Sequence, residues 1–123
     1  MILIHEVLMG RDKQAPLDDV QWRNLADLLC RINALRVHYG KPMTVSSGYR
    51  PPHINANAGG AKRSAHMSCQ AVDFADPNGE LAAWCLKNLK LLIQLGLYLE
   101  DPAYTKNWVH LQSRPTNSNP FKP

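Results

Sequence analysis

The stretch between Asp18 and Gly40 constrains the fold more than any other feature of the sequence. Its apolar residues recur at spacings of three and four, which is the period of one helix face. They are Trp22, Leu25, Leu28, Leu29, Ile32 and Leu35. Asp18 is a typical N-cap, and Gly40 followed by Pro42 is a typical stop. The sequence therefore predicts one long helix, whose apolar face the rest of the chain has to cover.

The remaining segments predict short strands and a second helix. The β-prone runs are residues 43–45, 70–74, 97–100 and 108–111. The last two runs are expected to pair as an antiparallel hairpin, and an apolar stripe from Leu81 to Leu95 indicates the second helix. The proline-, asparagine- and glycine-rich residues 48–68 predict a long irregular loop, which is typically functional or disordered. Together these segments predict an α+β fold, with a small antiparallel sheet packed against two main helices.

The length of 123 residues indicates a single domain, residues 1–123. An N-terminal segment, 1–16, and a proline-rich tail, 113–123, flank its centre, and Phe121 is expected to dock the tail on the body. No apolar run reaches the ~18 residues of a membrane span, so we expect no membrane partner. The first residues carry no basic leader, so we expect a protein made in the cytoplasm without a signal peptide.

The charges and the cysteines narrow the possible partners and compartments. The chain has 14 basic and 10 acidic residues, a net charge of +4, which favours anionic partners such as cell-wall polymers. The basic residues are scattered and no aromatic residues interleave with them, so nucleic-acid binding is not expected. Cys30, Cys69 and Cys85 are widely spaced and odd in number, which favours reduced thiols, and Cys30 and Cys85 fall at apolar helix positions. The sequence leaves the oligomeric state open.

Two histidines and one aspartate form the candidate metal site. His66 lies in the long loop, Asp73 on the strand that follows it, and His110 on the last strand. Two imidazoles and one carboxylate suit a catalytic zinc ion, because three protein ligands leave a fourth position for water. The spacing alone is also compatible with a capped loop histidine, a surface aspartate and a strand histidine without metal.

The order and surroundings of these residues resemble a known family. Five short motifs follow one another in the same order as in the zinc D-Ala-D-Ala carboxypeptidases. They are Ser47-Gly48-Tyr49-Arg50, Gly59-Gly60, Ser64-x-His66, Ala71-x-Asp73 and Trp108-x-His110. That family includes vancomycin-resistance dipeptidases and phage peptidoglycan lysins, and it shares the fold of the hedgehog signalling domain. The resemblance covers the chain from about Leu35 to Gln112. It implies that His66, Asp73 and His110 bind one zinc ion, and that Arg50 polarises the scissile carbonyl or holds the substrate.

Four residues around the candidate ligands are candidates for substrate binding. A guanidinium such as that of Arg50 is a fixed donor fork for an oxyanion or a carboxylate, although it also suits a structural ion pair. Ser64 either orients the substrate or His66 by hydrogen bonding, or it only caps the loop. Trp108 is expected to wall the pocket, whereas Trp22 and Trp84 are expected in the core. Gln112 lies on the same strand face as His110, and it either reaches the site or is a solvated polar residue.

The sequence departs from the family pattern at two positions. The family has glycine where this chain has Cys69, which is interpreted as a tolerated small residue rather than a fourth ligand. Many members carry an acid three residues before the last histidine as general base, where this chain has Asn107. An amide cannot accept a proton from water at neutral pH. Glu100 and Asp101 are the nearest preceding acids, and we expect one of them, Glu100 first, to be the base; the alternative is that both only solvate the turn.

The resemblance leads to one main interpretation and two alternatives. We expect a zinc metallopeptidase that hydrolyses an amide bond in peptidoglycan stem peptides, as a D-Ala-D-Ala carboxypeptidase or as a phage endolysin released at lysis. The alternative that Asn107 favours is an inactive zinc-containing binding module or virion component on the same fold. A metal-free interaction domain is the third interpretation.

Overall fold

The computed structural model describes residues 1–123, and it has an α+β architecture. In chain order the elements are α1 (Ile4–Leu8), the 3-10 turn η1 (Arg11–Lys13), α2 (Asp19–Tyr39), β1 (Val45–Ser47), α3 (Pro52–Asn57), β2 (Ala71–Ala75), α4 (Glu80–Lys87), α5 (Leu89–Gln94), β3 (Tyr98–Leu99), the 3-10 turn η2 (Pro102–Tyr104) and β4 (Trp108–Gln112). The strands form one antiparallel sheet in the order β1-β2-β4-β3. The predicted fold class is thus confirmed. None of the helices combines the length and the apolar character that crossing a membrane requires.

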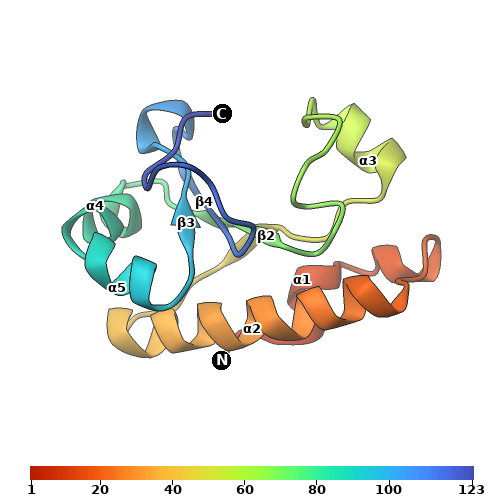
Figure 1. The fold of residues 1–123 in the computed structure, drawn as a ribbon, viewed down its shortest axis with the longest axis horizontal. Coiled ribbons are helices and arrows are strands. Elements are labelled where there is room, and N and C mark those ends of the chain that lie inside the picture. The colour runs from red at the N-terminus through yellow and green to blue at the C-terminus, as the bar shows by residue number, and fades with distance from the viewer.

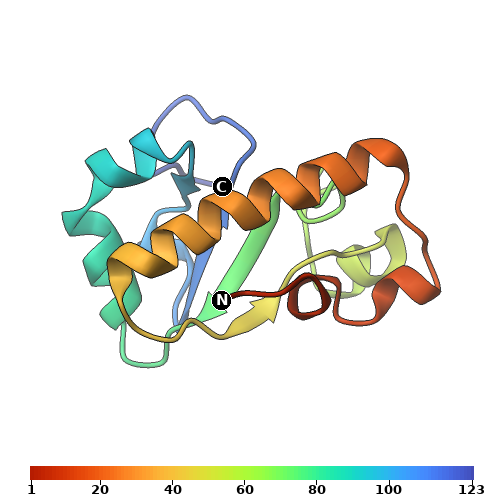
Figure 2. The ribbon, with the colours of Figure 1, turned by 90° about the horizontal axis from the view of Figure 1, so that it is seen from below.

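Helix α2 is the long helix that the sequence predicts, and it covers one face of the sheet. Asp18 begins it with a capping box, and Gly40 ends it in the left-handed conformation. Figures 1 and 2 show α2 running the length of the molecule beside the sheet, with α4 and α5 at one end and α3 at the other. Its buried residues share one hydrophobic core with the inward-facing residues of the strands, among them Leu25, Leu28, Ile32, Leu35, Val72, Phe74, Val109 and Leu111.

Some local expectations are wrong. Trp22 is 44% exposed, because it lies in the first turn of α2, where the helix extends beyond the strands (Figure 2). Cys30 is exposed as well, whereas Cys85 is buried. The second helix is two helices, α4 and α5, because Asn88 leaves the helical conformation between them and its side chain caps the Trp84 carbonyl at 2.8 Å.

The loop between β1 and β2 is partly helical. The predicted irregular segment 48–68 contains the short helix α3, which has Pro52 in its first turn, where a missing N–H costs nothing. Strand β1 begins two residues later than predicted, at Val45. The rest of the loop returns along the sheet and delivers His66 next to Arg50, whose N–H donates to the His66 carbonyl at 3.2 Å.

The strand register creates a polar face opposite α2. Asp73 on β2 pairs directly with His110 on β4, and Ala71 pairs with Gln112. Because side chains alternate along a strand, the residues between them turn to the other face and join the core against α2. Asp73, His110 and Gln112 therefore share the sheet face that α2 leaves free.

The tail docks on the free edge of β3, as predicted for Phe121. The Asn119 side chain accepts from the Leu99 N–H at 2.9 Å and donates to the Leu97 carbonyl at 2.8 Å. Phe121 then forms a β-bridge with Glu100, with hydrogen bonds to Leu99 and Asp101 on either side. These bonds cover the edge strand and place the Phe121 ring beside His110, with the ring centroids 5.9 Å apart.

Candidate metal centre

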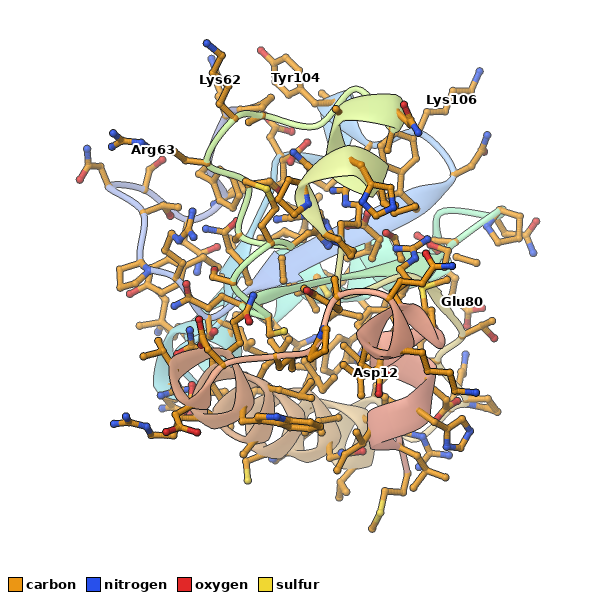
Figure 3. All side chains as sticks on the ribbon, turned by 90° about the vertical axis from the view of Figure 1, so that its right-hand side faces the viewer. Asp12, Lys62, Arg63, Glu80, Tyr104 and Lys106 are labelled. Carbon is orange, nitrogen blue, oxygen red and sulfur yellow. The ribbon has the colours of Figure 1, made fainter.

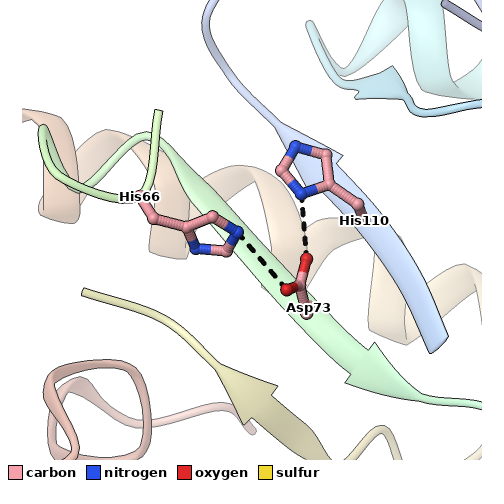
Figure 4. A group of neighbouring side chains, drawn as sticks. All are labelled: His66, Asp73 and His110. Carbon is pink, nitrogen blue, oxygen red and sulfur yellow. Dashed lines mark hydrogen bonds and ion pairs between the residues drawn. The ribbon is translucent and has the colours of Figure 1, made fainter. Parts of the chain in front are cut away.

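Three side chains from separate parts of the sequence converge on the free face of the sheet. His66 comes from the loop before β2, Asp73 from β2 and His110 from β4, and their potential ligand atoms all lie within 4.8 Å of one another. Figure 4 shows the Asp73 carboxylate between the two imidazoles. Its Oδ2 lies 3.4 Å from His66 Nε2, and its Oδ1 lies 2.9 Å from His110 Nδ1. The sheet register therefore brings together the three ligands that the resemblance implies.

His66 is oriented by a main-chain carbonyl. Its Nδ1 lies 2.8 Å from the Gly48 carbonyl oxygen, which can only accept, so Nδ1 carries the proton in the neutral ring. Its Nε2 is buried and has no hydrogen-bond partner. Burial lowers the pKa of His66, despite the neighbouring Asp73 carboxylate, and so favours the neutral imidazole. The ring thus presents an unshared electron pair towards Asp73.

Asp73 and His110 form a strongly coupled pair. Burial by itself raises the pKa of Asp73, but the hydrogen bond from His110 and the proximity of the His66 ring hold it well below its usual range. For His110, burial lowers the pKa, and the hydrogen bond and charge of Asp73 more than offset this and raise it. The second ring nitrogen of His110, Nε2, lies 2.8 Å from Gln112 Oε1. Only Nδ1 of His110 faces the other two ligands.

This donor set fits a zinc ion. Two imidazole nitrogens and one carboxylate oxygen are a ligand set typical of catalytic zinc, and they leave a position for water or substrate. An unpaired, fully buried His66 Nε2 is costly unless something binds it, and a metal ion is such a partner. The Gly48 carbonyl gives His66 the outer hydrogen bond that metal-binding histidines usually have.

The three side chains lie at one wall of a cleft of about 400 Å³. Its lining includes Arg50, Ala58, Gly59, Gly60, Ala61, Arg63, Ser64, Glu100, Trp108, Gln112, Arg114 and Phe121. Figure 3 shows Lys62 and Arg63 projecting outwards from the loop that leads to His66. Glu100 is the only acidic side chain besides Asp73 in this lining. The cleft is thus basic on the side of the loop, and it has a single carboxylate free for proton transfer.

Arg50 lies in the cleft without an ion-pair partner. No carboxylate lies within 4.0 Å of its guanidinium, and its buried Nε has no hydrogen-bond partner. Burial lowers its pKa, although the nearby Asp73 opposes this change, and a guanidinium remains charged at neutral pH. The structure therefore offers a free donor fork beside the metal site, and no structural ion pair.

The other predicted site residues divide into two groups. Trp108 and Ser64 line the cleft, and the Ser64 hydroxyl also accepts from the His66 N–H at 3.2 Å. The Gln112 side chain also lines it, but its oxygen is occupied by His110. Asp101 does not reach the cleft, because its carboxylate accepts from the Ala103 N–H at 3.0 Å and begins the turn η2.

Glu100 lies opposite His110 on the neighbouring strand. Its N–H donates to the His110 carbonyl at 3.1 Å, so both side chains turn to the same sheet face. Burial raises the pKa of Glu100, with a further contribution from the Asp73 charge, while His110 opposes it. The structure brings the first of the two predicted acids to the metal site and leaves the second in a turn.

The two departures from the family pattern both lie at residues with a left-handed backbone conformation. Cys69 has φ +60° and Asn107 has φ +75°, a region that favours glycine or asparagine. Cys69 is fully buried in the core, outside the group formed by His66, Asp73 and His110, and burial raises the pKa of its thiol to about 12. Asn107 lies in the turn before β4, outside the cleft, and its carbonyl accepts from the Asp76 N–H at 2.8 Å.

Sequence reasoning missed two residues that support the site. Gly48 supplies the carbonyl for His66, and a Cβ at this glycine would lie 2.2 Å from the Val7 carbonyl oxygen. The only sequence signal for this close approach is the glycine itself. The sequence indicates only that Arg114 belongs to the proline-rich tail. In the structure its guanidinium donates to the Arg63 carbonyl, the Ser68 hydroxyl and the Gln70 side chain.

Comparison with known proteins agrees with this site. The family model described as Peptidase M15 matches residues 5–112, which include all three candidate ligands. No curated protein and no solved structure matches the chain. The match covers most of the chain, from α1 to the end of β4. The chain therefore belongs to the peptidase M15 family, whose members depend on zinc.

Proposed function

We propose that this protein is a zinc metallopeptidase that hydrolyses an amide bond in peptidoglycan stem peptides. The observation that carries the proposal is the cleft itself, where the three metal donors, one free carboxylate and one unpaired guanidinium meet. These are the groups that metal-assisted amide hydrolysis needs. The positive net charge and the basic rim of the cleft suit an anionic cell-wall polymer. We further propose that the protein reaches the wall at lysis or in a virion.

The zinc ion would be held by His66 Nε2, Asp73 and His110 Nδ1. When bound, zinc supplies Lewis acidity to the scissile carbonyl and makes the attacking water more acidic. The Asp73 charge partly neutralises the ion, and the Gly48 carbonyl keeps the His66 ring in its binding orientation. The residues around the cleft supply the remaining functions.

Glu100 is the proposed general base. It is the only free acidic side chain lining the cleft, and its raised pKa makes it a stronger base than an ordinary glutamate. In this role it accepts a proton from the attacking water and passes it to the leaving amine. Asn107, at the usual position for this base, carries an amide and lies outside the cleft.

Arg50 is the proposed partner of the substrate carbonyl. A half-buried, unpaired guanidinium stabilises negative charge that develops on the carbonyl oxygen, and it does so without having to break an existing ion pair. Trp108, which is 38% exposed at the cleft, supplies an apolar wall for the peptide. The Ser64 hydroxyl is held by the His66 N–H and has its own proton left to donate to the substrate.

The test is to incubate purified protein with peptidoglycan, with and without a chelator, and to analyse the released fragments by mass spectrometry. We expect fragments that contain a newly cut peptide bond, formed only without chelator. Glu100→Gln should reduce the rate by about two to four decades while zinc stays bound. Asp101→Asn is the matched control, and it should retain activity because its carboxylate caps a turn. Full activity of Glu100→Gln refutes the assigned base.

The second candidate function is a zinc-containing binding or virion module without turnover, which Asn107 favours. This candidate predicts that the protein binds zinc and peptidoglycan but releases no fragments. Sedimentation with insoluble peptidoglycan, measured beside the cleavage assay, distinguishes the two functions. Restoration of cleavage by Asn107→Asp would indicate descent from an enzyme that kept its base at that position.

A further inference from the structure

Gln112 occupies a position between a metal ligand and a fixed carbonyl. Its side chain is 7% exposed on the same strand face as His110. Oε1 lies 2.8 Å from His110 Nε2, and Nε2 of the amide donates to the Arg114 carbonyl at 2.9 Å. Both ends of the amide are thus engaged inside the protein, an arrangement that suits a positioning role for Gln112.

These two hydrogen bonds determine which nitrogen of His110 keeps its proton when the other binds a metal ion. The Arg114 carbonyl can only accept, so the amide NH₂ faces it and the amide oxygen faces His110. An amide oxygen also only accepts, so His110 Nε2 must be the donor. The Asp73 carboxylate at Nδ1 also only accepts, so both ring nitrogens donate in the metal-free site. A metal ion that replaced the Nδ1 proton would leave the Nε2 proton in place, donated to Gln112.

The carbonyl that orients Gln112 is itself held in place. The Arg114 guanidinium donates to the Arg63 carbonyl at 2.6 Å and to the Ser68 hydroxyl at 2.8 Å, on either side of His66. One residue therefore fastens the loop that carries His66 and fixes the amide that contacts His110. This arrangement fixes Gln112 more firmly than a solvated strand residue.

We propose that Gln112 is a positioning residue of the metal centre, which holds His110 in the tautomer that offers Nδ1 to the ion. The inference rests on the zinc site of the proposed function, and it adds a residue outside the ligand set. Metal-binding histidines commonly donate their second N–H to a protein acceptor, and loss of that acceptor typically weakens metal binding by about 10- to 100-fold. For His66 the acceptor is the Gly48 carbonyl, and for His110 it is Gln112.

The first test measures zinc affinity by competition with a chromogenic chelator, independently of catalysis. Gln112→Met has nearly the same shape and no strong acceptor, and we expect its zinc affinity to fall by about 10- to 100-fold. Gln112→Glu keeps an oxygen acceptor for His110, loses the bond to the Arg114 carbonyl and adds a negative charge, so it should bind zinc more tightly than Gln112→Met. Asn33→Leu is the control, because the Asn33 amide also bonds at both ends, to Ile2, far from the site. It should leave zinc affinity unchanged.

The second test reads the tautomer directly. In the ¹⁵N NMR spectrum of the zinc-loaded wild-type protein, His110 should show a protonated Nε2 and a metal-bound Nδ1. Zinc on His110 Nε2, or equal zinc affinity of Gln112→Met and wild type, overturns the inference even if the protein is an active peptidase. Failure of the wild type to bind zinc overturns the proposed function, and the role of Gln112 with it. The NMR result stands without variants, so it decides the question even if Gln112→Met does not fold.

Discussion

Gly48→Ala is the substitution that most directly tests how the fold supports the metal centre. The added Cβ would lie 2.2 Å from the Val7 carbonyl oxygen and 2.8 Å from its carbon, so it would meet main chain that no rotamer change can move. The same short segment makes two bonds, from the Tyr49 N–H to the Val7 carbonyl and from His66 Nδ1 to the Gly48 carbonyl, each 2.8 Å long. A shift of residue 48 away from α1 would lengthen the first bond and displace the carbonyl that orients His66.

The expected magnitude follows from these contacts. Forcing an extra carbon into a packed site typically costs about 1–3 kcal/mol. Loss of the Tyr49–Val7 hydrogen bond adds about 0.5–1.5 kcal/mol. We therefore expect the free energy of unfolding to fall by about 2–4 kcal/mol. Movement of the Gly48 carbonyl away from His66 should weaken zinc binding by about 10- to 100-fold, because the ring loses the partner that orients it.

Urea unfolding of the metal-free protein and zinc competition measure the two effects separately. Gly40→Ala is the control, since its Cβ meets nothing within 4 Å and its φ of +75° makes it a test of backbone strain alone. It should lose about 1 kcal/mol of stability and no zinc affinity. Wild-type stability and zinc affinity in Gly48→Ala would refute the argument that this close approach positions His66.

Two further predictions concern the tail and the pH. Asn119→Ala removes both hydrogen bonds to β3, so it should lower the free energy of unfolding by about 1–3 kcal/mol. Because the substitution also frees Phe121, it should raise the KM for the peptide and leave the zinc affinity unchanged. Unfolding and steady-state kinetics measure this, and an unchanged KM would exclude Phe121 from the substrate cleft. Zinc affinity should fall as the pH is lowered through the raised pKa of His110, by about tenfold per pH unit, because zinc must then displace a proton, whereas His66 is already neutral. Competition titrations over pH measure it, and a flat profile would contradict the Asp73–His110 pairing.

The site shows where reasoning from the sequence succeeds and where it fails. The resemblance to a peptidase family depended on the order of short motifs, and the family match over residues 5–112 confirms it. Side-chain length could rank Glu100 before Asp101 as the candidate general base, but the sequence could not decide between them. Consecutive residues of a strand point their side chains to opposite faces of the sheet. The pairing of Glu100 with His110 therefore determines which acid faces the cleft.

Gln112 illustrates the same limit. The sequence places its side chain on the face of His110, because residues two apart on a strand point the same way. It does not reveal that the Arg114 carbonyl fixes the amide, since Arg114 lies in a polar tail without a regular pattern. Gly48 is similar, because a glycine in the sequence does not say which segment approaches it.

The elements whose causes are local can be predicted from the sequence alone. The capping box and the spacing of apolar residues are sufficient for α2 to begin after Asp18 and end at Tyr39, and alternation is sufficient to place Asp73 on a strand face. Three features depend on tertiary packing instead: the exposure of Trp22, the break of the second helix at Asn88, and the pairing of Asp73 with His110. Helix caps and periodicity act over a few residues, whereas strand register and burial depend on how segments far apart in the chain pack together.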